Sequence, residues 1–342
     1  MYEKVSMKLF VKLIFCAAII ILHFSCQPGR LRNLLLRPDY RKAMRSFVRQ
    51  ISSKAKNQKP GFIVIAQNGL ELLTDNGTAN GIPDQSYLNA LDGVGQEGVF
   101  FGYEFENGET PGPIRDHLSA YLNISHLIGK QKLVIDYCST SSDMDESYLL
   151  NDLYGFLSFA TDKRKLNTIP LHSSKPFNVN SENISEIIQA RNFLFILSYE
   201  LFDRRSDFLQ TLRHTDYDLL IIDLFYNDGI AFTPEEVQSL KTKNNGGSRL
   251  VLCYLSIGEA ENYRYYWHKS WEKNAPRWLE KENPKWPGNY KVKYWNKNWQ
   301  SIITGNADSY LQKIINSKFD GVYLDIIDAF QYFEQNYQNS AK

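Results

Sequence analysis

The sequence predicts a single (β/α)8 barrel, the α/β architecture also called a TIM barrel. Eight short apolar runs are continuous aliphatic blocks, which is typical of parallel strands buried on both faces. The intervals between them are long enough for crossover helices, and eight such units fit the length of 342 residues. A doubly wound sheet is the competing arrangement on pattern alone. The predicted strands are 62–66, 88–94, 132–137, 155–160, 193–198, 218–224, 249–256 and 321–326.

Composition limits the class of protein. With 43% hydrophobic and 14% aromatic residues, the chain is neither disordered nor a disulfide scaffold, and it has enough apolar residues for a substantial core. The net charge of +1 gives no excess that would attract nucleic acid. We therefore expect no nucleic-acid partner.

The N-terminus has the pattern of an export signal. Three lysines precede the apolar run 13–22, and Ser25-Cys26 follows it. This pattern predicts a lipoprotein-type signal peptide over 1–25, lipidation of Cys26 and a linker over 26–38, with the barrel domain over 39–342. Ordinary cleavage nearby and an uncleaved anchor are the alternatives. We expect an exported protein of the bacterial cell envelope, attached to the membrane through this lipid, or else a secreted or periplasmic soluble protein.

The remaining sequence features indicate no bound cofactor or metal. Cys138 and Cys253 lie in apolar runs on opposite sides of the predicted barrel, so we expect two free thiols. Residues 93–98 match GxGxxG, but a helix does not follow, and we interpret the match as chance. The histidines show no ligand spacing. Before the first strand, residues 38–56 have the apolar spacing of an amphipathic helix.

Polar residues gather where the predicted strands end, which is the face that carries chemistry in such barrels. At least five of the eight ends present carboxylates, as glycoside hydrolysis by two carboxyl groups requires. Each residue also has a structural interpretation: Asp328 as a helix cap, Asp223 or Asp136 as a buried acceptor, and Glu261 with Arg264 as an i,i+3 pair. The six tryptophans all lie between Trp267 and Trp299, where they either pack in a core or lid, or stack on sugars.

Several sequence blocks resemble a known family. They are 251–264 (VLCYLSIGEAENYR), 286–295 (WPGNYKVKYW), 319–330 (FDGVYLDIIDAF), 65–69 (IAQNG) and 92–97 (DGVGQE). Together they resemble glycoside hydrolases related to family 114, the endo-α-1,4-polygalactosaminidase type of TIM barrel. The resemblance implies a hydrolase that cleaves an amino-sugar polysaccharide or oligosaccharide, such as α-1,4-galactosaminan. The alternative is a non-catalytic carbohydrate-binding surface lipoprotein on the same barrel.

The order of these blocks differs from that of the family, because the IAQNG-containing half comes first here. The sequence is similar to a circular permutant, which a closed ring of strands tolerates. We therefore expect the strand at 62–66 to pair with the strand at 321–326.

The resemblance also implies roles for individual residues. Asp325 corresponds to the nucleophile and Glu97 to the general acid/base. The substrate-binding residues that it implies are Asp223, Glu259, Glu261, Arg264, Asp328, Asn68, Asp136 and Tyr137. An excess of acids among them suits a positively charged amino sugar.

Overall fold

The computed structural model describes residues 38–127, 129–170 and 175–340. All elements below belong to one compact unit, Tyr40–Lys342. The predicted signal peptide, Cys26 and the linker up to residue 37 lie outside the described residues. Within those ranges, no helix has both the length and the apolar character needed to cross a membrane.

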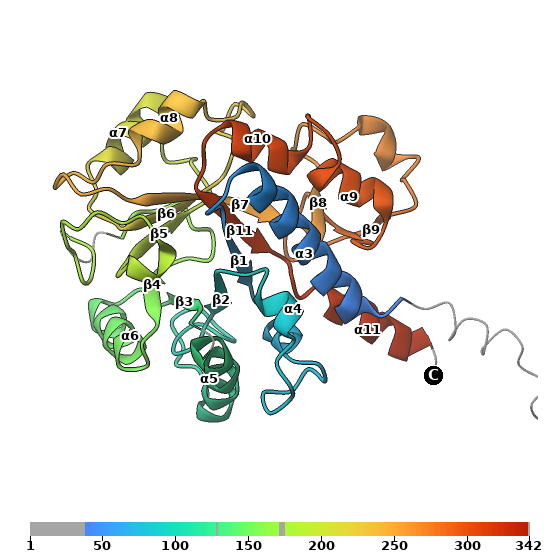
Figure 1. The fold of residues 1–342 in the computed structure, drawn as a ribbon, viewed down its shortest axis with the longest axis horizontal. Helices are drawn as coiled ribbons and strands as arrows, with labels where there is room; N and C mark the ends of the chain where they lie inside the picture. Colours follow the sequence, from blue (N-terminus) through green and yellow to red (C-terminus); the bar gives the residue numbers. More distant parts are fainter. Residues whose placement is uncertain (1–37, 128, 171–174, 341–342) are drawn as a thin grey trace, which may run out of the picture. The chain divides into compact units, whose positions relative to one another are not determined.

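Eight parallel strands form the central sheet, in the order β4-β3-β2-β1-β11-β7-β6-β5 (Figure 1). At its two edges, Phe159 of β4 and Phe193 of β5 pack with ring centroids 5.7 Å apart, so the sheet curves into a nearly closed barrel. The prediction of a (β/α)8 barrel is confirmed. The strands are β1 (Ile63–Gln67), β2 (Gly93–Glu97), β3 (Gln131–Tyr137), β4 (Leu157–Thr161), β5 (Phe193–Ile196), β6 (Leu219–Ile222), β7 (Leu250–Ser256) and β11 (Gly321–Asp325).

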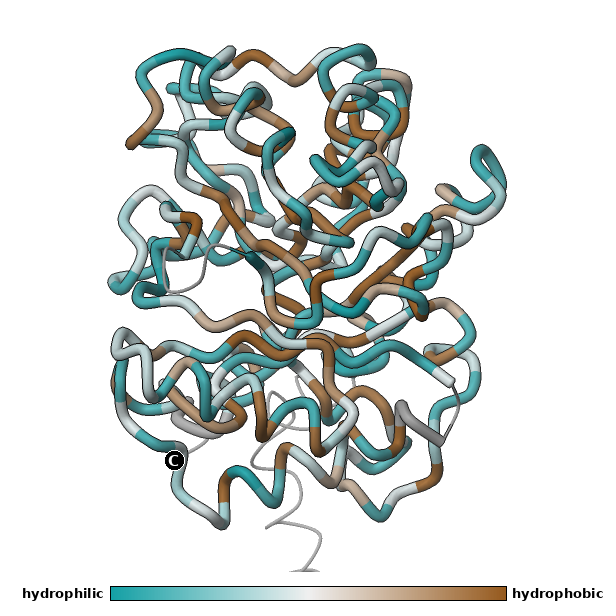
Figure 2. The backbone as a smooth tube through the Cα atoms, turned by 90° about the vertical axis from the view of Figure 1, so that its left-hand side faces the viewer, coloured by the Kyte–Doolittle hydropathy of each residue, from teal (hydrophilic) through white to brown (hydrophobic). Residues whose placement is uncertain are grey.

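Helices surround the strands, and apolar segments concentrate in the middle of the molecule (Figure 2). The first helix, α3, buries Met44, Phe47, Val48 and Ile51 on one face, as the spacing over 38–56 predicts. The helices are α3 (Tyr40–Gln58), α4 (Gln85–Leu88), α5 (Gly112–Leu127), α6 (Ser141–Leu153), α7 (Arg205–Arg213), α8 (Pro234–Ser239), α9 (Lys297–Thr304), α10 (Tyr310–Asn316) and α11 (Ala329–Ser340), with 3-10 turns η1 (Leu70–Leu73), η2 (Ile187–Gln189) and η3 (Lys269–Glu272).

The first and last strands of the barrel are neighbours. Strand β1 pairs in parallel with β11, with Ile63 opposite Gly321 and Ala66 opposite Leu324. The expected pairing of 62–66 with 321–326 is confirmed. On its other side β1 pairs with β2, so the ends of β11, β1 and β2 lie side by side.

One predicted strand is misplaced. Residues 85–88 form helix α4, because the side chain of Asp84 accepts the backbone N–H of Tyr87 and caps it. The strand begins only at Gly93, so the run 88–94 overlaps it by two residues. Residues 93–97 are therefore strand, and the GxGxxG match is not a loop before a helix.

A second sheet, which the sequence analysis did not predict, follows β7. It is antiparallel, in the order β8-β10-β9, formed by β8 (Glu259–Glu261), β10 (Asn289–Val292) and β9 (Leu279–Glu282). Because β8 begins three residues after β7 ends, this sheet lies beside the carboxyl end of the barrel strands.

Gly95 of β2 is a position inside the barrel at which a side chain does not fit. A Cβ on Gly95 would overlap Tyr323 Oη and Gln67 Oε1, which are hydrogen-bonded to each other. We therefore expect Gly95→Ala to lower the free energy of unfolding by about 1–3 kcal/mol, as overpacking does. Urea denaturation of this variant beside Gly108→Ala, whose Cβ meets nothing closer than 3.4 Å, measures the effect. An equal loss in both variants would contradict this explanation.

Three aspartates stabilise the opposite, amino-terminal ends of the strands. Asp92, Asp218 and Asp320 each accept a backbone N–H, from Val64, Arg191 and Val251 respectively. Each also forms an ion pair with a lysine. The pair between Lys243 and Asp218, 2.8 Å apart, has both side chains 0% exposed. These contacts fix the strands at the end of the barrel that confers stability.

The cysteine prediction agrees with the structure. Among the described residues, Cys138 and Cys253 are buried free thiols. Burial raises the pKa of Cys138 to about 12, which makes the thiol unreactive near neutral pH.

Candidate active site

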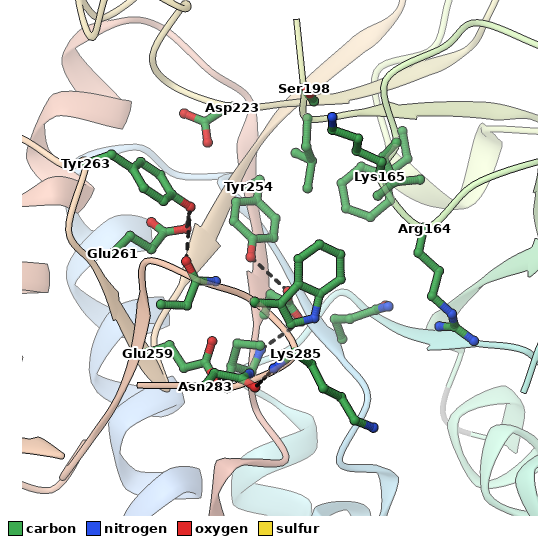
Figure 3. A pocket seen from close by; sticks show the side chains of 18 of the residues that line it. Arg164, Lys165, Ser198, Asp223, Tyr254, Glu259, Glu261, Tyr263, Asn283 and Lys285 are labelled. Carbon is green, nitrogen blue, oxygen red and sulfur yellow. Dashed lines mark hydrogen bonds between the residues drawn. The ribbon is translucent and has the colours of Figure 1, made fainter. Parts of the chain in front are cut away.

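A cavity of about 1110 Å³ opens at the carboxyl ends of the strands (Figure 3). Its walls come from the ends of β1, β2, β6, β7 and β11 and from the antiparallel sheet. Eight of the ten predicted catalytic and substrate-binding residues line it: Asn68, Glu97, Asp223, Glu259, Glu261, Arg264, Asp325 and Asp328.

Asp325, the last residue of β11, is held by two donors. The hydroxyl of Tyr254 donates to Oδ2 at 2.9 Å, and the backbone N–H of Ile326 donates to Oδ1 at 2.7 Å. Burial, followed by the negative charge of Glu97, raises the pKa of Asp325 to about 7. The carboxyl group therefore exchanges its proton near neutral pH, as groups at reactive sites commonly do.

Glu97, the last residue of β2, is also fixed by two donors. The Tyr137 hydroxyl donates to Oε1, and Asn68 Nδ2 donates to Oε2 at 3.2 Å. Because Glu97 contributes to the raised pKa of both Asp325 and Asp328, these three carboxyl groups are electrostatically coupled. Asp325 and Glu97, the predicted catalytic pair, are therefore among these coupled groups.

The backbone around this pair has two unusual conformations. Asn68 and Ile326 both have positive φ, at 61° and 58°. Asparagine tolerates this left-handed region, but a β-branched isoleucine does so only when the surrounding structure enforces it. At Ile326 this conformation accompanies the backbone N–H contact to Asp325.

One wall of the cavity is a buried cluster around Arg264. Its guanidinium forms a bidentate pair with Asp223, at 2.8 and 2.6 Å, and Nε donates to Glu261. Tyr263 donates its hydroxyl to the other oxygen of Glu261 at 2.8 Å (Figure 3). Glu261 and Arg264 therefore form the expected i,i+3 ion pair. Asp223, 41 residues away in sequence, forms a second ion pair with the same arginine. The cluster carries one net negative charge.

Glu259 is fully buried, yet it lines the cavity. Its Oε1 accepts from Asn283 Nδ2 at 2.9 Å and pairs with Lys291. Its Oε2 has no hydrogen-bond partner among the described residues. A buried carboxylate oxygen without a donor is costly, and the contacts of Oε1 with Lys291 and Asn283 offset part of that cost.

Asp328 lies one helical turn beyond the end of β11, just before α11. Burial raises its pKa to about 6, while Lys291 lowers it and Glu97 raises it further. Asp328 lines the cavity, so a structural role as a helix cap would be compatible with its place in the site.

Two predicted substrate contacts, Asp136 and Tyr137, do not line the cavity. Asp136 is fully buried and accepts from Phe100 N, Phe101 N, Ser147 Oγ and Asn151 Nδ2, so its acceptors are occupied by the fold. The structure therefore favours the structural interpretation of Asp136 over a substrate contact. Tyr137 contacts Glu97 and acts through it.

Several lining residues were not predicted. Tyr254 holds Asp325, and Lys291 pairs with Glu259; neither has a sequence signal beyond its place in the family-like blocks. Among the six tryptophans, all in the described part of the chain, only Trp286 lines the cavity, and it is 47% exposed. Trp267, Trp271, Trp278 and Trp299 pack in a contiguous series of ring contacts.

Comparisons with known proteins relate part of the chain to a glycoside hydrolase family. Residues 198–342 match the model of Glycoside-hydrolase family GH114. This segment contains β6, β7 and β11 and most of the acidic wall, whereas Asn68 and Glu97 lie outside it.

Three proteins of other organisms are similar to the chain. An uncharacterized protein of Methanocaldococcus jannaschii is 38% identical over 186 residues, which cover 53% of this chain and 50% of that protein. An uncharacterized protein of Deinococcus radiodurans is 41% identical over 123 residues, 36% of this chain and 37% of that protein. One of Thermotoga maritima is 40% identical over 122 residues, 35% of each. The chain thus spans half the length of the first relative and less of the others.

Proposed function

We propose that the protein is a glycoside hydrolase in which Asp325 is the nucleophile and Glu97 the general acid/base. The observation that carries this proposal is the placement of both carboxyl groups in one cavity, at the ends of the two strands that flank β1. The match of residues 198–342 to a glycoside hydrolase family supports it.

The chemistry needs one protonated and one ionised carboxyl group. Glu97 protonates the oxygen of the departing sugar while ionised Asp325 attacks the anomeric carbon, and Glu97 then activates water to release the glycosyl group. Asp325 and Glu97 are electrostatically coupled, so a proton on one carboxyl favours the ionised form of the other. Tyr254 orients Asp325, and Tyr137 with Asn68 orients Glu97.

An amino-sugar polysaccharide, such as an α-1,4-galactosaminan, is the proposed substrate. Seven carboxylates and five cationic side chains line the cavity, and Asp223 and Glu261 share a single arginine. The excess of negative charge favours a substrate that carries ammonium groups.

We also propose that the barrel is a circular permutant of the family. The family match covers the second half of the chain, and β1 pairs with β11 as a permuted ring requires. Export and lipidation at Cys26 remain part of the proposal, on the sequence pattern alone.

The variant Glu97→Gln tests the pair. We expect it to lower kcat on unactivated polysaccharide by about 10²–10⁴-fold, the range for loss of general acid–base catalysis. Removing the charge of Glu97 also lowers the pKa of Asp325, so the acid limb of kcat/KM, near pH 7 in the wild type, moves to lower pH. Aryl glycosides with good leaving groups keep the variant's activity measurable.

Glu104→Gln is the matched control, because Glu104 lines the same cavity but is not among the main causes of the raised pKa of Asp325. Equal effects in both variants would contradict the assignment of Glu97. If the wild type binds galactosamine oligosaccharides but releases no reducing ends from any polymer, the non-catalytic binding protein is the correct alternative.

A further inference from the structure

Arg164 is a fixed cation in the cavity wall, on the loop after β4. Its guanidinium lies over the ring of Tyr137, 4.3 Å from the centroid, and Nη2 donates to the carbonyl oxygen of Gly102. The residue is half-buried and lines the cavity. Its Nε and Nη1 donate to no acceptor within the described ranges, so these N–H groups are available to a ligand.

Arg164 differs in this respect from the other arginine of the cavity. Arg264 is neutralised by two carboxylates, whereas Arg164 forms no ion pair with any described residue. Glu104 and Glu106 lie on the neighbouring loop; Glu106 accepts only the backbone N–H of Arg164. A half-buried guanidinium without a counterion favours the binding of an anion.

Lys285 provides a second available cation. It lies on the loop between β9 and β10, lines the cavity, and its ammonium has no partner in the part of the chain that the structure describes. In Figure 3, Arg164 lies across the view from Tyr263, Glu261 and Glu259. Lys165, on the same side as Arg164, is paired with Glu200. The acidic wall therefore lies across the view from one unpaired cation, Arg164, while Lys285 follows Asn283, which contacts Glu259.

The contacts of Tyr137 place Arg164 on one side of the scissile bond. Tyr137 donates its hydroxyl to Glu97, and Arg164 stacks on the ring of the same tyrosine. If Glu97 protonates the departing oxygen, as the proposed function states, the departing sugar lies on the side of Glu97 and hence of Arg164.

We infer that Arg164 binds an oxyanion substituent on the leaving-group sugar, a uronic acid carboxylate, and that Lys285 adds a second positive charge to the cavity wall. Nε–H and Nη1–H lie on different edges of the guanidinium, so one of them donates a single charge-assisted hydrogen bond to a carboxylate oxygen. The substrate is then a mixed polymer, in which an amine-bearing unit faces the acidic wall and an acidic unit follows it. The orientation of the polysaccharide in the cavity rests on the proposed function, because it depends on Glu97 as the general acid. The anion site itself does not depend on that function.

Binding measurements test the site without hydrolysis. Calorimetry of the wild type with digalacturonate and with neutral galactobiose should show preferential binding of the uronate. We expect Arg164→Gln to weaken digalacturonate binding by about 10-fold or more, the loss of one charge-assisted hydrogen bond, and to leave galactobiose unchanged. Lys285→Gln should also weaken digalacturonate binding, but by a smaller factor, and it leaves the contact between Arg164 and Tyr137 unchanged. Lys163→Gln, an exposed neighbour outside the cavity, is the matched control.

The outcomes separate the two proposals. No preference of the wild type for digalacturonate, or equal weakening of both ligands in Arg164→Gln, overturns the anion site. Preference for a sulfated galactobiose over digalacturonate keeps the oxyanion site but replaces the carboxylate. Selective uronate binding without hydrolysis of any mixed polymer overturns the proposed function and leaves the anion site in place.

Discussion

Asp325→Asn is expected to abolish hydrolysis and, at the same time, to make the protein more stable relative to the wild type as the pH rises. The loss in kcat should be about 10³-fold or more, because the variant has no nucleophile. The stability effect follows from the pKa of about 7 for Asp325 in the folded protein, compared with its ordinary value of 3.8.

The sign of this effect follows from proton binding. Between about pH 4 and 7 the folded wild type holds a proton on Asp325 that the unfolded chain has lost, so wild-type stability falls as the pH rises through this window. Asparagine does not ionise, so the variant does not lose stability in this pH window for this reason. The difference in free energy of unfolding, variant minus wild type, should rise by on the order of 1–2 kcal/mol from pH 4 to pH 8, after allowance for the partial exposure of Asp325.

Asparagine has a single side-chain acceptor, so one of the contacts from Tyr254 and Ile326 is lost. That loss is a constant offset, and the slope with pH is therefore the informative quantity. Thermal or urea unfolding at several pH values measures it. A difference that does not change with pH would show that Asp325 has an ordinary pKa, and full hydrolytic activity would refute its role.

Asp218→Asn should produce the largest loss of stability. The substitution leaves the ammonium of Lys243 buried without its counterion, which typically costs about 3–5 kcal/mol. Urea denaturation at pH 7 measures the loss, while activity in the folded fraction should persist because Asp218 is outside the cavity wall.

Two further variants make this result specific. Lys243→Met should cost a similar amount, and the double variant should cost less than the sum, because the charges are removed together. Lys56→Gln is the exposed comparison. Lys56 and Asp92 form an ion pair in which the side chains are 30% and 29% exposed. The loss in free energy of unfolding should therefore stay below about 1 kcal/mol. A loss at Asp218 as small as that at Lys56 would contradict the buried-pair explanation.

The barrel could be predicted from the sequence because its strands are buried on both faces and therefore appear as continuous apolar runs. β2 is the exception, because its residues Gly93 and Gly95 have no apolar side chain to contribute. The apolar run that includes Leu88 was therefore predicted as the strand, and its predicted start lies five residues before Gly93. The small sheet of β8, β9 and β10 was missed because its strands are short and two of them are only partly buried.

The candidate site could be predicted in part, because carboxylates at strand ends converge in any parallel barrel. The rest depends on contacts between distant residues. Whether Asp136 faces the cavity or the outer layer is decided by Ser147 and Asn151 on the following helix. The neutralisation of Arg264 by Asp223, and the lack of such a partner at Arg164, are equally invisible in a single sequence.

The pairing of β1 with β11 also governs when the ring can close. Gln67 and Tyr323, which hydrogen-bond between these strands, are 256 residues apart, so this contact carries one of the largest loop-closure entropies in the chain. Until β11 pairs with it, β1 has one unpaired edge. Such delayed closure predicts slow folding, and the folding intermediate in which β11 has not yet docked is the one most open to association through that edge.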